Sequence, residues 1–194
     1  MSGFYLLETL GDSNDDKLAF VEDYVTGLEM KDWKTKYGHR TASDWPPDAS
    51  MVLRKTSGKK IADLVGTITN NLIVSQRLRA LIEQYAKDVE IEYLPVQLHD
   101  HRNRLLSAEH VIVNPVGTRD CLDLKASDIL WDKDDSRKAL SVRVPVISAK
   151  KADGLPALFR IKEKPASYVV SFTLAKPIHD GAYTNVRWQK LEVR

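Results

Sequence analysis

The amino-acid sequence predicts an α+β fold with a mostly antiparallel or mixed sheet and few helices. Short runs of apolar and β-branched residues recur along the chain, several of them alternating with polar residues, and such runs are typical of strands. Only one segment shows a clear helical spacing of apolar residues. Because helical connections are scarce, a regular alternation of strand and helix is disfavoured.

The first quarter of the chain opens with an apolar run at residues 4–7, which predicts a buried strand. Residues 11–16 predict a polar turn, and residues 18–25 fit either a strand or a short helix. Residues 30–51 contain Gly38 and two consecutive prolines and predict a long irregular loop. Loops of this length are commonly functional.

The clearest helix follows a strand predicted at residues 72–74. Ser75 is a good N-cap, because its hydroxyl can accept a hydrogen bond from a free backbone N–H of the first helical turn. After it, four apolar residues recur at helical spacing and predict one buried face: Leu78, Leu81, Ile82 and Tyr85. This face requires a sheet or another helix to pack against.

Six further segments predict strands. They are residues 89–94 (ended by Pro95), 110–113 (followed by a turn at Asn114 and Pro115), 140–147, 158–161, 168–170 and 186–193.

Two stretches of the chain share a pattern. Ile73, Val74 and Ser75 precede an apolar helix and a strand, and Val169, Val170 and Ser171 do the same. In both stretches apolar residues stand three and seven positions after the serine. A duplicated strand–helix–strand unit is one interpretation, and coincidence is the other, because serine caps before apolar helices are common.

We expect a single domain over residues 1–194, with an acidic segment and long loop at 1–58 and an α+β body at 59–194. The 43% of hydrophobic residues suffices for a core. Residues 1–50 hold ten acidic and five basic residues, whereas the whole chain has a net charge of +2. A dedicated nucleic-acid binder shows a basic excess, so we expect no nucleic-acid partner.

A reducing cytoplasm fits the single cysteine, Cys121, which allows no disulfide within the chain. The N-terminus lacks the features of a signal peptide, and no apolar stretch approaches the length of a membrane span. We therefore expect a cytoplasmic protein with no membrane partner.

Catalytic and metal-binding motifs are weak. His99, Asp100 and His101 are ligand types, but no further ligand stands at a diagnostic spacing and neighbouring arginines oppose a cation. The carboxylates beside Cys121 disfavour a reactive thiolate. The aspartates after Trp131 lack the glycine and glutamate of a calcium loop. The sequence predicts no metal, no cofactor and no enzyme; an enzyme with a dispersed site near His99 and His101 is a lesser alternative.

A family resemblance is carried by several stretches. Residues 72–82 read Leu-Ile-Val-Ser-Gln-Arg-Leu-Arg-Ala-Leu-Ile, and residues 89–96 read Val-Glu-Ile-Glu-Tyr-Leu-Pro-Val. With Val-Ile-Val-Asn-Pro at 111–115, then Asp120, Asp123 and Ser127, they resemble the immunity-protein domain family numbered eleven of bacterial polymorphic toxin systems. The similarity covers roughly residues 60–190.

The resemblance implies an immunity protein that binds and neutralises a cognate secreted toxin by blocking its active site. The partner would be a toxin domain, and the family supplies no catalytic residues. A scaffold that binds a non-toxin protein is the alternative. Neither the toxin nor the oligomeric state follows from the sequence.

Charge and aromatic placement suggest where a basic partner would bind. The candidate carboxylates are Asp12, Asp15, Asp16, Glu22, Asp23, Glu29 and Asp32, and the candidate aromatic anchors are Trp33, Tyr37 and Trp45. Two simpler interpretations stay open at this point: a solvated acidic face, and aromatic side chains that cover the core.

Overall fold

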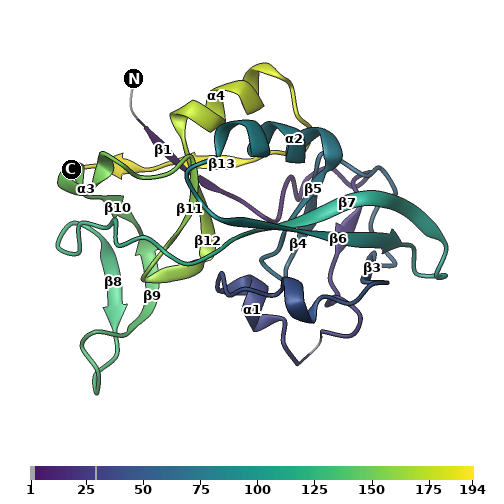
Figure 1. Ribbon diagram of the computed structural model, residues 1–194, viewed down its shortest axis with the longest axis horizontal. Coiled ribbons are helices and arrows are strands. Elements are labelled where there is room, and N and C mark those ends of the chain that lie inside the picture. The colour runs from purple at the N-terminus through teal and green to yellow at the C-terminus, as the bar shows by residue number, and fades with distance from the viewer. Residues whose placement is uncertain (1–2, 29) are drawn as a thin grey trace.

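The computed structural model describes residues 3–28 and 30–194, and its two main sheets are of mixed and antiparallel type (Figure 1). The larger sheet has the strand order β2-β4-β5-β7-β6-β3. Its strands are β2 (Phe20–Val21), β3 (Ser50–Val52), β4 (Leu64–Thr67), β5 (Leu72–Ser75), β6 (Ile91–His99) and β7 (Leu105–Pro115). β2 pairs with β4 and β3 with β6 in parallel, and the other pairs are antiparallel.

The smaller sheet is antiparallel and has the order β11-β12-β1-β13. Its strands are β1 (Phe4–Leu7), β11 (Leu158–Ile161), β12 (Lys164–Ser171) and β13 (Trp188–Lys190). Two further pairs stand apart from it: the hairpin of β8 (Asp128–Trp131) with β9 (Ala139–Val144), and β10 (Val146–Ile147) with β14 (Glu192–Val193). The predicted α+β class with a mixed sheet is confirmed.

The helices are few. α2 (Gln76–Tyr85) and α4 (Phe172–Asp180) lie side by side along one side of the molecule (Figure 1). Three short helices complete the set: α1 (Trp33–Lys36), the 3₁₀ helix η1 (Ala42–Asp44) and α3 (Ala149–Ala152). No helix within the described residues is long and apolar enough to cross a membrane.

The two sheets contain the same unit. β5, α2 and β6 follow one another in the chain, as do β12, α4 and β13, and in each case one antiparallel strand, β7 or β1, lies between the two strands. The correspondence extends to a fourth strand, because Leu64 of β4 faces Val74 and Leu158 of β11 faces Val170. The repeated pattern of the sequence therefore corresponds to a repeated topology.

Equivalent residues of the two units build one core between them. Leu72, Val74, Leu78 and Ile82 of the first unit pack in the same cluster as Tyr168, Val170, Leu174 and Ile178 of the second, and all eight are buried. Each such side chain contributes about 1.5–3 kcal/mol when it is removed from water. The units therefore stabilise each other through this shared layer.

Different segments of the chain cover the outer face of each sheet. Ile73 of β5 points away from the shared core and packs in a second buried cluster. Residues 19–53 cover this cluster and contribute Val21, Val25 and Met51 to it. Val169 of β12 likewise packs among residues from the β8–β9 region, such as Val142. The acidic segment is therefore joined to the body by packing, and its status as a separate part of one domain stays a prediction.

Pro95 and Pro115 lie inside strands, and the strand ends predicted there from the sequence are wrong. β6 continues through Pro95 to His99. β3 pairs only with residues 97–99 of β6, so no strand lies beside Pro95 on that side. The Pro95 carbonyl accepts a hydrogen bond from Trp45 Nε1 at 2.8 Å instead. A missing N–H is tolerated at such an edge position. Asn114 and Pro115 form no turn but end β7, paired with Glu92 and Ile91.

The residues 30–51 also contain more structure than the irregular loop that the sequence predicts. α1 and η1 form single turns there, and β3 begins at Ser50. Long-range contacts stabilise these turns, since isolated helices of this length are not stable in water.

Arg160 makes the central long-range contact. Its guanidinium is fully buried and donates to the carbonyls of Thr35 at 2.6 Å, Lys36 at 3.0 Å, Pro115 at 3.1 Å and Pro165 at 2.8 Å. It therefore joins α1 to the C-terminal end of β7 and to β12.

The remaining contacts of Arg160 are with side chains. Nη2 donates to Asn114 Oδ1 at 3.2 Å and to Tyr168 Oη at 2.8 Å, and the guanidinium lies 4.2 Å from the centre of the Tyr168 ring. No carboxylate in the described part of the chain is paired with this charge. Neutral acceptors and an aromatic ring stabilise it instead.

Ser75 and Ser171 occupy equivalent cap positions, but only Ser75 uses its side chain. Its hydroxyl accepts from Leu78 N at 3.2 Å and donates to Asp63 Oδ1 at 2.8 Å, whereas Ser171 makes no capping bond. We expect Ser75→Ala to lower the free energy of unfolding by about 1 kcal/mol and Ser171→Ala by less than half of that. Urea unfolding of both variants checks this, and equal losses would contradict it.

Replacing Arg160 leaves several buried acceptors without a donor. We expect Arg160→Leu to lower the free energy of unfolding by about 3 kcal/mol or more. Arg160→Lys keeps the charge but offers three donors in place of five, so it should recover only part of the loss. Urea unfolding measures both, with the exposed Arg143→Leu as control; a loss for Arg160→Leu no greater than that of the control would refute the role of Arg160.

Candidate protein-binding site

The aromatic residues of the 30–51 segment have different surroundings. Trp33 and Tyr37 are exposed, with 44% and 39% of their surface accessible. Trp45 is half-buried, packs against the core that residues 19–53 close, and binds the Pro95 carbonyl. Trp45 thus covers the core, one of the possibilities that the sequence left open, while Trp33 and Tyr37 face outward.

The exposed aromatic pair is held by contacts on the inner side of α1. Arg160 binds the carbonyls of Thr35 and Lys36 in the last turn of α1, where the regular helical hydrogen bonds end. The Trp33 ring meets His39 edge-on at 5.0 Å, and Lys36 lies 5.5 Å from the centre of the Tyr37 ring. The backbone that carries the two aromatic side chains is therefore held in position by its hydrogen bonds to Arg160.

Gly38 is required where the chain leaves α1. Its φ of +73° is a conformation that other residues rarely adopt. A Cβ there would lie 2.8 Å from Arg160 Cδ and 2.9 Å from the Pro115 carbonyl oxygen. The absence of a side chain at Gly38 allows α1 to approach the Arg160 guanidinium.

Asn114 and Glu92 fix the next part of the segment. Asn114 Nδ2 donates to the His39 carbonyl and to Glu92 Oε2, each at 2.9 Å. The Glu92 carboxylate accepts the backbone N–H groups of Thr41 and Ala42 at 2.9–3.0 Å. One amide thus links the Arg160 charge to the Glu92 charge.

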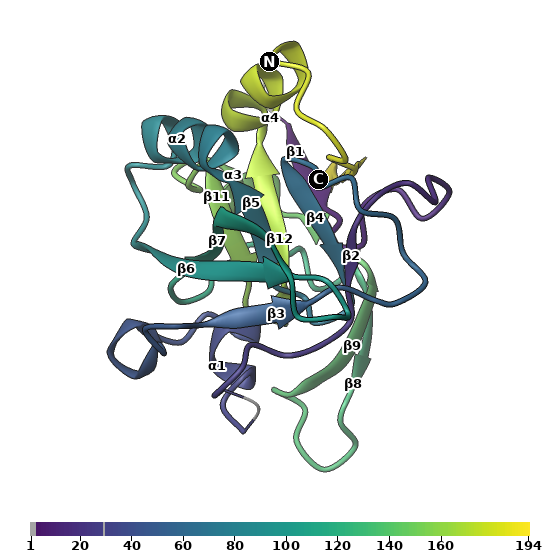
Figure 2. The same ribbon diagram turned by 90° about the vertical axis from the view of Figure 1, so that its right-hand side faces the viewer.

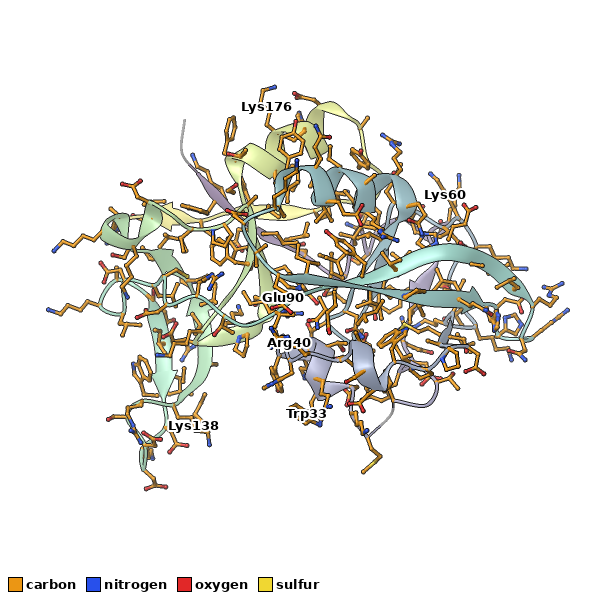
Figure 3. The ribbon with its side chains drawn as sticks, viewed as in Figure 1. Trp33, Arg40, Lys60, Glu90, Lys138 and Lys176 are labelled. Atoms are coloured by element: carbon orange, nitrogen blue, oxygen red, sulfur yellow. The ribbon has the colours of Figure 1, made fainter. Side chains whose placement is uncertain are left out.

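An exposed ion pair borders this region. Arg40 Nε and Nη2 donate to the two oxygens of Glu90 at 2.8 and 2.6 Å, and Figure 3 shows both side chains above Trp33. The pair holds the pKa of Glu90 below its usual range. Because both side chains are well exposed, solvent screens the pair and its contribution to stability is small.

Three of the candidate carboxylates gather in another place. Asp12, Asp15 and Asp16 line a pocket of about 400 Å³ at the loop that follows β1. None of the three candidate aromatic residues lines it. In Figure 2 the purple loop after β1 lies at the right and α1 at the lower left, so the acidic and aromatic candidates form two separate groups.

The other candidate carboxylates lie outside the pocket lining. Glu22 is exposed and pairs with Arg54, its Oε2 2.6 Å from Arg54 Nε. Asp23 is exposed, and Asp32 precedes α1 without a capping bond. Glu29 lies outside the described residues.

The histidine cluster has a structural role at its centre. Asp100 is buried, and its carboxylate accepts the N–H groups of Arg102 and Arg104 and the Arg104 Nε, at 2.8–3.0 Å. The hydrogen bond from the Arg104 side chain is the main reason why the pKa of Asp100 lies far below its usual range, and the backbone N–H groups add to the effect. Asp100 therefore shapes the turn between β6 and β7.

The thiol of Cys121 is not activated as a nucleophile. Cys121 is buried, and burial, with Glu163 and Asp120, raises the pKa of its thiol to about 12. In the parts of the chain that the structure describes, no group of three or more His, Cys, Asp or Glu side chains is placed to hold a metal ion.

The sequence identified Trp33 and Tyr37 as candidates but missed the residues that position them. Glu92 and Asn114 come from the paired strands β6 and β7, and Arg160 comes from β11. Nothing in their local sequence pattern shows that they contact residues 35–42. Sequence reasoning also missed the apolar Leu10 and Ile68, which line the acidic pocket. Their exposure becomes visible only in the folded structure.

A comparison with known protein families agrees with the family resemblance of the sequence motifs. No curated protein matches the chain. The model of the immunity protein family Imm11 matches residues 9–193, which is nearly the entire chain. The chain therefore belongs to the Imm11 immunity protein family.

Proposed function

We propose that this protein acts in the cytoplasm, where it binds a cognate secreted bacterial toxin and neutralises it by covering the toxin's active site. Membership of an immunity protein family supports the toxin-neutralising role. The observation that carries the binding mode is the exposed pair Trp33 and Tyr37 on a segment fixed by Arg160, Asn114 and Glu92.

Such an arrangement is suited to tight binding. Aromatic side chains provide large contact areas with little loss of side-chain entropy, and they dominate the energetics of many interfaces. A segment already held in one conformation avoids the ordering cost on association. Trp33 and Tyr37 are therefore the anchors, whereas Trp45 covers the core beneath β6 and residues 19–53.

The carboxylates act on the rate of encounter in this proposal. Asp12, Asp15, Asp16, Glu22, Asp23, Glu29 and Asp32 belong to a segment with a net negative charge. Acidic side chains at or beside an interface speed the approach of a basic partner, and added salt weakens the effect.

Neutralisation is tested by co-expression. The toxin domain that co-purifies with the tagged protein from its native host is expressed in a sensitive bacterium, with and without this chain. Growth restored by this chain, and not by an unrelated immunity protein, supports the proposal. Absence of any co-purifying toxin domain, with the genes beside this one expressed, contradicts it.

Truncation of the two anchors should weaken binding without unfolding the protein. We expect Trp33→Ala and Tyr37→Ala each to cost about 2 kcal/mol of binding energy, roughly a 30-fold rise in Kd, mainly through faster dissociation. Surface plasmon resonance with the captured toxin domain measures this. Leu105→Ala removes a similarly exposed apolar side chain at the start of β7 and serves as control. Equal Kd values for the anchor and control variants would show that α1 is not part of the interface.

A further inference from the structure

The pocket beside the loop after β1 has an apolar wall. Its lining comes from three segments and Asn185: eight residues between 10 and 20, then Arg54, Thr56 and Ser57, and finally Gly66 and Ile68. Leu10 and Ile68 border it with 52% and 53% of their surface exposed. Large apolar side chains exposed together at a hollow are typical of binding surfaces.

Gly66 keeps part of this wall free of a side chain. A Cβ at Gly66 would lie 2.6 Å from the Leu10 carbonyl oxygen and 3.0 Å from the Phe20 ring. The Arg54 guanidinium, which also lines the pocket, lies 4.7 Å from the centre of the same ring. The hollow thus depends on close packing that any larger residue would disturb.

The charges around the pocket do not cancel. Asp12 pairs with Arg187 and Glu22 with Arg54. Asp15 and Asp16, which also line the pocket, form no ion pair with any residue that the structure describes. Asp15 Oδ1 accepts the backbone N–H of Lys17 at 3.0 Å. Two carboxylates without an ion-pair partner among the described residues therefore lie beside an apolar wall.

Hydrogen bonds at both ends hold the acidic loop, residues 11–17, in place. Asn185 accepts the Asp12 N–H at 2.6 Å and donates to the Leu64 carbonyl at 2.9 Å. Gly11 has a φ of +66°, and a Cβ there would overlap the Asn185 amide. At the other end of the loop, Lys60 N donates to the Lys17 carbonyl at 3.0 Å. The carboxylates are thus displayed by a fixed loop.

We infer that this pocket receives a lysine or arginine side chain of the protein partner. The inference rests on the proposed function, because it assigns that side chain to the toxin. The aliphatic stem of such a residue matches Leu10 and Ile68, and its cationic head matches Asp15 and Asp16. An acidic or purely apolar side chain would leave the two carboxylates without compensation when water is excluded.

The first test uses a small probe and the full chain. n-Butylguanidinium reproduces an arginine side chain, and n-butyramide has a similar alkyl stem without charge. In ¹H–¹⁵N spectra, n-butylguanidinium should give saturable shifts at Leu10, Gly66 and Ile68, and n-butyramide much smaller ones. No saturable shifts at these amides, or equal shifts with both probes, would overturn the inference.

A matched pair of variants locates the charges. Asp15→Asn with Asp16→Asn should weaken n-butylguanidinium binding roughly fivefold to tenfold. Asp134→Asn with Asp135→Asn, at the tip of the β8–β9 hairpin, changes the net charge equally and should leave binding unchanged. Equal effects of both pairs would show a general charge effect and overturn the inference.

The second test uses the toxin domain captured from the native host. The Asp15→Asn, Asp16→Asn variant should associate with it roughly fivefold more slowly at low salt, and the hairpin variant should not. A partner that binds both variants alike overturns this inference but leaves the proposed function intact. Self-association of the free chain that only the Asp15→Asn, Asp16→Asn variant abolishes would assign the pocket to a second copy, and would equally overturn it.

Discussion

The buried guanidinium of Arg160 is the contact that holds α1, the segment with Trp33 and Tyr37, against β7 and β12. A buried charge is costly unless every donor finds an acceptor, and Arg160 meets this condition with four backbone carbonyls, one amide and one hydroxyl. These acceptors belong to α1, the end of β7 and β12, so the charge is compensated only when all three come together. Order in the exposed segment is thus coupled to the docking of the two sheets.

The repeated topology places this contact at the boundary between the two sheets. The two β-β-α-β units share their inner core, whereas each outer face is closed by a segment specific to it: residues 19–53 on the first sheet and the β8–β9 region on the second. The repeated framework provides stability, and the covering segments are where the units differ. The two surfaces proposed to meet the partner, α1 and the acidic loop, both come from the first quarter of the chain.

The parts of the fold that local physics determines could be predicted from the sequence. The cap at Ser75, the apolar face of α2 and the equivalent pattern at Ser171 depend on residues a few positions apart. The passage of β6 through Pro95 and of β7 through Asn114 could not be predicted, because a third element accommodates each exception: Trp45 in one case, Arg160 with Glu92 in the other. For the site, residue type and charge indicated the aromatic and acidic candidates, but only the tertiary structure shows that they form two groups.

The central claim is that the partner meets a surface already formed in the free protein. Hydrogen–deuterium exchange of the chain alone and bound to its captured toxin domain tests it most directly. The account predicts that the amides of residues 35–45 are already slow to exchange in the free chain, and that binding adds protection around α1 and the loop after β1. Fast exchange of residues 35–45 in the free chain, or added protection confined to other surfaces, would contradict it.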